Sequence, residues 1–173
     1  MKSFFAWFFI SRTLWTMKHP SFVNKNRNIV KKLLPHWNVY QRNIPIQNYS
    51  LEHIIPQRLF LEPTHAYDLN NLVSCEHEWN SIRSDFRYGI GKTTKKKIYN
   101  FGEIYPQERI FAPSDMADYG LLSRSTLYML HRYPYLYRVL DQIIDPPYLL
   151  DVWSHYPRSP YEQLRSEFMK VCE

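Results

Sequence analysis

Four polar side chains in two short stretches have the types needed to hydrolyse a phosphodiester bond. Glu52 and His53 are adjacent, whereas Asn80 comes later in the chain, three residues before Arg83. A hard divalent cation prefers oxygen ligands, so the carboxylate of Glu52 and the amide oxygen of Asn80 are candidate metal ligands. Histidine accepts a proton near neutral pH, which makes His53 the candidate base that activates water. Arginine can grip a phosphate through two N–H groups, and Arg83 is the candidate catalytic arginine.

Two short strands and a helix must position these side chains. Residues 51–56 have the alternation and the β-branched residues of a short strand and end at a proline, which predicts a strand. Residues 72–74 predict a second short strand. Residues 76–88 lack glycine and proline, and their polar pattern predicts a helix that carries Asn80. The same helix would place Arg83 one turn from another arginine, so that both could face phosphates.

The order of side chains along the first strand raises a geometric question. Adjacent residues of a regular strand face opposite ways, and Glu52 and His53 are adjacent. They can serve one cleft only if the strand bends or if the metal lies beside the path of the water. Between the two strands, Asp68 is expected to form a turn or cap, and Asn71 to tie the loop that orients His53.

The chain is basic, which favours a polyanion as its partner. Its net charge is +6 at pH 7 and its isoelectric point is about 9.3. Nucleic acid is the simplest such partner, although charge alone also fits a merely soluble basic protein. A run of lysines follows the predicted helix. It could be part of a solvated surface or a loop that contacts the phosphate backbone, and the sequence favours neither. The candidate nucleic-acid-binding residues are Arg58, Arg87, Lys92, Lys95, Lys96 and Lys97.

The ordered motifs resemble those of the endonuclease I family, a group of His-Me finger (ββα-metal) nucleases that act non-specifically on DNA and RNA. The matching pieces are Glu52-His53 with Pro56, then Asp68-x-x-Asn71-Leu72, then Asn80-x-x-Arg83-Ser84. Further matches in the C-terminal half are Pro113, Gly120, Arg124, residues 127–129, Trp153, Glu162 and Arg165. The resemblance implies the same base and ligands as above, 5′-phosphate products and Mg²⁺ as the metal, with Mn²⁺ or Ca²⁺ as alternatives.

The expected architecture is a single α+β domain over residues 1–173, mostly helical around a ββα finger at residues 50–90. Further helices are expected at residues 21–34, 121–132, 145–153 and 161–171, and residues 111–173 would form a helical cover. The aromatic segment 1–20 fits the apolar part of a signal peptide or an arm packed on the domain. It lacks a clear cleavage site, so export, as in secreted relatives, and retention in the cell remain open. Cys75 and Cys172 could pair or stay reduced.

The predicted activity is therefore a metal-dependent endonuclease that acts on DNA and RNA as a monomer, without an obligate protein partner. Two alternatives remain. A non-catalytic nucleic-acid-binding protein on the same scaffold would not need Glu52, His53 and Asn80 together. A site-specific HNH-type nuclease shares the ββα core, but the C-terminal matches and the absence of zinc-type cysteine pairs argue against it.

Overall fold

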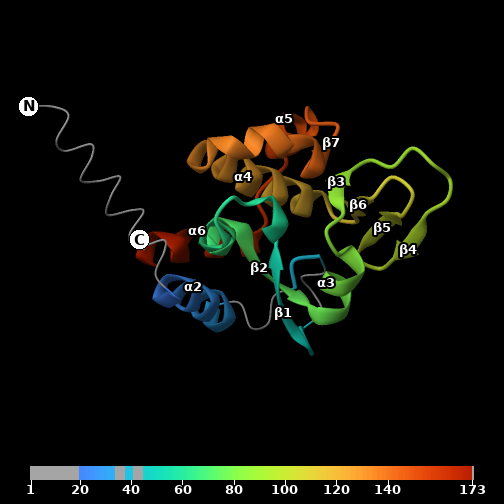
Figure 1. The fold of residues 1–173 in the computed structure, drawn as a ribbon. Coiled ribbons are helices and arrows are strands. Elements are labelled where there is room, and N and C mark those ends of the chain that lie inside the picture. Colours follow the sequence, from blue (N-terminus) through green and yellow to red (C-terminus); the bar gives the residue numbers. More distant parts are fainter. Residues whose placement is uncertain (1–19, 34–37, 41–44, 173) are drawn as a thin grey trace, which may run out of the picture.

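The computed structural model describes residues 20–33, 38–40 and 45–172. The aromatic N-terminal segment 1–20 lies outside the described residues except for its last residue. The first helix, α2 (Pro20–Leu33), agrees closely with the predicted range 21–34. Figure 1 shows this helix near the C-terminal helix, on the side of the molecule away from the larger sheet. Within the described ranges, no helix has both the length and the apolar character needed to cross a membrane.

A two-stranded hairpin followed directly by a helix carries the candidate site. Strand β1 (Tyr49–His53) pairs antiparallel with β2 (Leu72–Glu76), and α3 (His77–Arg83) begins at the next residue. The register places Glu52 opposite Val73. Both strands and the helix were predicted, but β1 begins and ends earlier than residues 51–56. Because the strand ends at His53, the chain turns away immediately after the two candidate residues.

The prediction that the helix continues to residue 88 is wrong. Ser84 follows the last helical residue with a φ of 55°, a value outside the helical region, and this ends α3. Residues Arg87–Gly89 then form strand β3. The side chain of Tyr88 is buried in the core, so tertiary packing overrides the local helical pattern here. Arg83 and Arg87 therefore do not share a helical face.

Strand β3 belongs to a second, five-stranded sheet in the order β4-β5-β6-β3-β7. The other strands are β4 (Lys97–Tyr99), β5 (Gly102–Tyr105), β6 (Ile110–Pro113) and β7 (Ile144–Asp145). Strand β3 pairs in parallel with both β6 and β7, whereas the β4–β5–β6 meander is antiparallel. The α+β class is confirmed. The expectation of a mostly helical domain is wrong, because the two sheets are a substantial part of the described chain.

Three short 3-10 turns connect β1 to β2: η1 (Gln57–Leu59), η2 (Pro63–Tyr67) and η3 (Leu69–Asn71). The Asn71 carboxamide, which is fully buried, holds this connection together. Its Oδ1 accepts from the Ile55 N–H at 2.7 Å, and its Nδ2 donates to the Ala66 carbonyl at 2.9 Å. Asp68 accepts from the Asn70 N–H at 2.9 Å and so caps η3. Both side chains organise backbone, as turn-forming residues do.

The C-terminal elements cover the hairpin and the larger sheet. They are α4 (Met116–Arg132), η4 (Pro134–Gln142), α5 (Leu149–Ser154) and α6 (Pro160–Cys172). Figure 1 shows α4 and α5 side by side above the finger. From α6, the buried Arg165 donates to the carbonyls of Leu69 at 2.6 Å and Leu72 at 3.1 Å. The last helix therefore braces the start of β2, although it lies far from it in sequence.

An aromatic core anchors α3, which is too short to be stable alone. The Trp79 ring stacks on Phe101 with centroids 5.0 Å apart, and Tyr40 meets Phe111 edge-on, also at 5.0 Å. Burying one such side chain contributes about 1.5–3 kcal/mol. Cys75 lies in the same core as a free thiol, and burial raises its pKa. The side chain of Cys172 is outside the described part.

Candidate active site

The side chain of Glu52 is buried and hydrogen-bonded in the protein interior, and Glu52 also lines a surface hollow. The side chain is 1% exposed, and its Oε1 accepts hydrogen bonds from Tyr40 Oη at 3.1 Å and Tyr88 Oη at 3.4 Å. Arg83 Nη1 lies 3.1 Å from the same oxygen. Burial raises the pKa of Glu52, and the charge of Arg83 opposes that rise. Among the described residues, no hydrogen bond or ion pair uses Oε2, which leaves that oxygen for a ligand.

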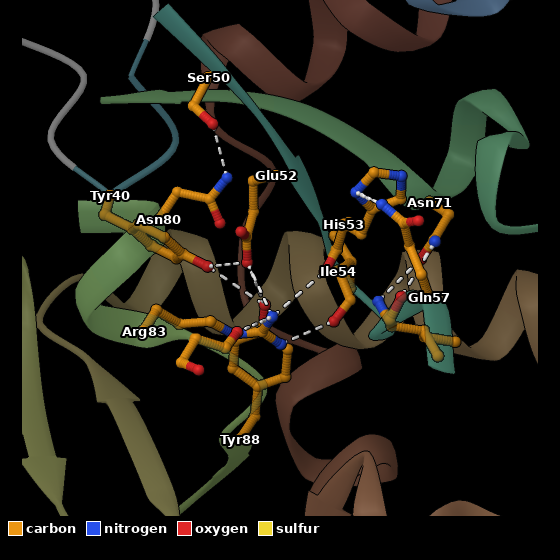
Figure 2. A network of polar contacts seen from close by, with 12 residues as sticks. Tyr40, Ser50, Glu52, His53, Ile54, Gln57, Asn71, Asn80, Arg83 and Tyr88 are labelled. Atoms are coloured by element: carbon orange, nitrogen blue, oxygen red, sulfur yellow. Dashed lines mark hydrogen bonds and ion pairs between the residues drawn. The ribbon is translucent and has the colours of Figure 1, made fainter. Parts of the chain in front are cut away.

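Asn80 presents an oxygen on the same side of β1 as this carboxylate. Its Nδ2 donates to Ser50 Oγ at 2.7 Å and to the Leu51 carbonyl at 3.2 Å. A carbonyl oxygen can only accept, so these bonds determine which way the carboxamide is turned. Figure 2 shows the Asn80 oxygen on the side of Glu52. Two oxygens from separate elements are thus directed toward one place.

His53 lies on the other side of the strand, as the alternation of strand residues requires. Its Nδ1 is 3.2 Å from Gln57 Nε2, and its ring stands at 87° to the Tyr67 ring, with centroids 5.0 Å apart. Burial, together with the charges of Arg83 and Arg27, lowers the pKa of His53 to about 4. The imidazole is therefore neutral near pH 7. An amide N–H donated by Gln57 would leave the ring proton on Nε2.

One hollow of about 350 Å³ is lined by residues from both faces of β1. Its lining residues are Leu51, Glu52, His53, Pro56, Gln57, Arg58, Asn80, Arg83, Ser84 and Asp85. Glu52 and His53 line the same hollow because β1 ends at His53 and the following residues curve around its end. The structure thus brings together the candidate base and both candidate metal ligands, which come from separate elements.

Arg83 is placed differently from the expectation that it faces phosphate. Its side chain is 2% exposed, and it donates to the carbonyls of His53 at 3.3 Å, Ile54 at 2.9 Å and Ser84 at 3.0 Å. Together with the pair to Glu52, these contacts engage both terminal nitrogens. In this structure Arg83 is the buried counter-ion of Glu52 and ties α3 to the end of β1. A contact with phosphate stays a prediction.

Arg58 and Arg87 have different positions relative to the hollow. Arg58 lies on its rim, 47% exposed, and its Nε is 2.8 Å from Asp85 Oδ2. Arg87 does not line the hollow, because it belongs to β3 and its Nη2 pairs with Asp145 Oδ2 at 3.0 Å. The prediction that Arg87 would join Arg83 at the phosphates is therefore not supported by its position.

The lysine run lies on the exposed connection from β3 to β4 and on β4 itself. None of Lys92, Lys95, Lys96 and Lys97 lines the hollow beside Glu52 and His53. One of them, Lys96, is engaged with Glu103, whose Oε1 is 2.5 Å from Nζ. Their role in binding nucleic acid stays a prediction that rests on charge alone.

The contacts of the two supporting residues are with the backbone and with other side chains, and not with the imidazole of His53. Asp68 also pairs with Arg132 at 2.9 Å and so connects the loop to the end of α4. Asn71 holds the chain immediately after His53, because it bonds the N–H and the carbonyl of Ile55. Gln57 is not among the site residues that the sequence motifs predict. Its position four residues after His53, at the start of the loop, was the available signal.

A metal ion at this site would have two protein oxygens as ligands. Within the described ranges, no group of three or more His, Cys, Asp or Glu side chains is placed to hold a metal ion. Glu52 Oε2 and Asn80 Oδ1 offer a carboxylate and an amide oxygen. A site with only two protein oxygens suits Mg²⁺, which prefers oxygen ligands and keeps several of its waters. The donor set therefore fits a hard divalent cation and is a poor fit for Zn²⁺, which favours nitrogen and sulfur.

Comparison with known proteins assigns the chain to a family. The model of the family described as Endonuclease I matches residues 23–167, which include the hairpin, α3 and nearly all of the C-terminal cover. A comparison with curated proteins finds no match. The match covers most of the chain and includes every residue of the hollow described above. This protein therefore belongs to the endonuclease I family, a family of His-Me finger nucleases.

Proposed function

We propose that the protein is a metal-dependent endonuclease that hydrolyses phosphodiester bonds of DNA, and also of RNA, with little sequence preference. The products would carry 5′-phosphate ends. One observation carries the proposal: Glu52 and Asn80, whose Oε2 and Oδ1 accept no hydrogen bond within the described ranges, and His53, whose imidazole is neutral, line one hollow. Membership in a nuclease family supports the reaction class.

In this reaction His53 accepts the proton of the attacking water. Burial keeps the ring neutral, so a lone pair is present near pH 7. If Nδ1 is the accepting nitrogen, the attacking water replaces the N–H of Gln57 there. Gln57 orients the ring, and Tyr67 supports its face. A cation on Glu52 and Asn80 would stabilise the negative charge that develops on the phosphate and on the leaving 3′ oxygen.

The second role of the protein is to keep Glu52 ionised and in place. A buried carboxylate tends to become protonated, which would weaken its hold on a cation. Arg83 and the hydroxyl groups of Tyr40 and Tyr88 all favour the charged form of Glu52. They contact only one oxygen, so they favour the carboxylate without occupying its other side.

Arg58 is the arginine best placed to meet the substrate near the cleavage site. It lies on the rim of the hollow and is half exposed, whereas Arg83 is buried. The lysine run would add attraction that depends on salt and not on sequence. The HNH alternative is weakened by the family match over residues 23–167. A non-catalytic binding protein remains the alternative that an activity assay decides.

The test is nicking of a supercoiled plasmid with Mg²⁺ and with a chelator. We expect His53→Ala to lower the rate about 10²–10⁴-fold, as expected when a general base is lost. The matched control is His77→Ala, because His77 is exposed at the first position of α3 and does not line the hollow. Equal, chelator-resistant nicking by the wild type and His53→Ala would refute the proposal.

A further inference from the structure

A second hollow, of about 420 Å³, lies between α2 and β1. It is lined by Asn24, Arg27, Asn28, Lys31, Tyr49, Ser50 and Leu51. Leu51 also lines the hollow of the candidate active site, so the two hollows are neighbours along β1. Ser50 connects them as well, because it accepts the hydrogen bond of Asn80 described above.

The lining of this second hollow suits a phosphate backbone. Arg27 and Lys31 are exposed and positively charged, and none of the described residues that line the hollow is acidic. Asn24 and Asn28 add amide groups that can donate hydrogen bonds. The spacing of these four residues places them on one face of α2, the face that meets the hairpin. A rise of about 6 Å separates Arg27 from Lys31 along the helix axis, so the two cations can contact neighbouring phosphates of one strand.

Arg27 lies on the His53 side of β1. Its guanidinium carbon is 5.8 Å from the centre of the Tyr67 ring, and Tyr67 contacts the His53 imidazole edge-on at 5.0 Å between centroids. Tyr49 and His53 are four residues apart on the strand, so they share this face. The cation of α2 is thus close to the place where the water would be activated.

Tyr49 lines the same hollow, but its hydroxyl group does not contribute to the proposed site. Its hydroxyl oxygen is buried and, among the described residues, has no hydrogen-bond partner. Because this oxygen has almost no accessible surface, it does not face the hollow, and the hollow depends on Arg27 and Lys31 for its polar contacts.

We propose that the hollow between α2 and β1 binds the sugar-phosphate backbone of the substrate beside the scissile phosphate, through Arg27 and Lys31. This inference rests on the proposed function and extends it. The substrate is then a strand that continues beyond the cleaved bond on the His53 side. Binding through phosphates alone carries no sequence information, which agrees with an enzyme of little sequence preference.

The test measures binding without cleavage. A short fluorescein-labelled DNA duplex is titrated with the full chain in a chelating buffer, and fluorescence anisotropy gives Kd over a series of salt concentrations. We expect the double variant Arg27→Gln with Lys31→Gln to raise Kd about tenfold or more. The slope of log Kd against log salt should fall by up to about two, about one for each lost phosphate contact.

The matched control is Lys25→Gln, because Lys25 is an exposed cation on α2 that does not line the hollow. Its Kd should rise much less, and its salt slope should stay near that of the wild type. Equal effects per lost charge for the control and the double variant would overturn the proposal, as would a wild type that does not bind. Matching circular dichroism spectra and unfolding midpoints identify any loss of folding, and single variants then replace the double one.

The binding proposal and the nuclease proposal are tested by different measurements, so one can fail without the other. Binding is measured without a metal ion, whereas the nuclease proposal depends on metal-dependent nicking. A protein that binds through Arg27 and Lys31 but never cleaves would refute only the nuclease. A protein that cleaves with its full rate and affinity after both substitutions would refute only the binding site on α2.

Discussion

Arg83 Nη1 lies 3.1 Å from Glu52 Oε1, and both side chains are almost completely buried. The two residues come from α3 and β1, so this pair also joins the helix to the hairpin. Burial raises the pKa of the carboxyl group, and the arginine favours the ionised form. A carboxylate that is paired at one oxygen and open at the other is suited to hold a cation near the surface of the protein.

The first prediction concerns this pair. Arg83→Gln should destabilise the protein by about 3–5 kcal/mol, because it leaves the Glu52 carboxylate buried without its counter-ion. Urea unfolding followed by tryptophan fluorescence measures the change. Arg87→Gln is the matched control, since Arg87 pairs with Asp145 near the surface and should cost no more than about 1 kcal/mol. Similar losses for the two variants would show that Arg83 is not the counter-ion that Glu52 requires.

The second prediction concerns Asn80 as a metal ligand. Asn80→Ala removes the amide oxygen, so we expect the Mg²⁺ concentration for half-maximal nicking to rise at least about tenfold, toward the range typical of disturbed metal sites. Asn80→Asp keeps an oxygen and should be less affected. Asn70→Ala is the control, because Asn70 lies in η3 and does not line the hollow. An unchanged Mg²⁺ requirement for Asn80→Ala would remove Asn80 from the ligand set.

The third prediction concerns Asp85, which lines the hollow and accepts from two arginines. Arg58 Nε lies 2.8 Å from Asp85 Oδ2, and Arg109 contacts the other oxygen. Asp85→Asn removes a negative charge and releases both cations, so we expect Kd for DNA to fall several-fold and the salt slope to increase by about one. Asp151→Asn, on the exposed side of α5, changes the same charge as a control. The prediction fails if both variants tighten binding equally.

The fourth prediction concerns the pH dependence of stability. Hydrogen bonds from Lys96 and Tyr105 to Glu103 lower the pKa of Glu103 below its ordinary value of 4.5. A carboxyl group whose pKa is lower in the folded state stabilises the protein above about pH 4.5. This stabilisation is lost as the pH falls through the folded pKa. Unfolding midpoints of the wild type and Glu103→Gln should therefore differ most near neutral pH and converge in acid.

The control for this prediction is Glu78→Gln, an exposed residue of α3 with the same change of charge. Its midpoint difference from the wild type should vary less with pH than that of Glu103→Gln. A difference for Glu103→Gln that stays constant from neutral pH to below pH 4 would contradict the assignment of these hydrogen bonds.

The sequence by itself determined the family, the α+β class and the order of two strands and a helix. These features depend on local signals: adjacent motif residues, the proline after the first strand, and a helical pattern around Asn80. It also identified a candidate base, His53, and two candidate metal ligands, Glu52 and Asn80, and these three residues line one hollow in the structure. Residue type and order are sufficient for such conclusions, because they determine which functional groups are present, whereas distant neighbours then set the pKa values of those groups.

Only the tertiary structure decided what each charged side chain faces. Arg83 and Arg87 look alike in sequence, yet one is the buried partner of Glu52 and the other belongs to a strand of the larger sheet. Tyr40 and Tyr88 reach the same carboxylate from distant segments, and Arg27 reaches the surroundings of His53 from α2. These contacts arise when the core forms. Burial and long-range pairing are properties of the packed chain and not of any short stretch of it.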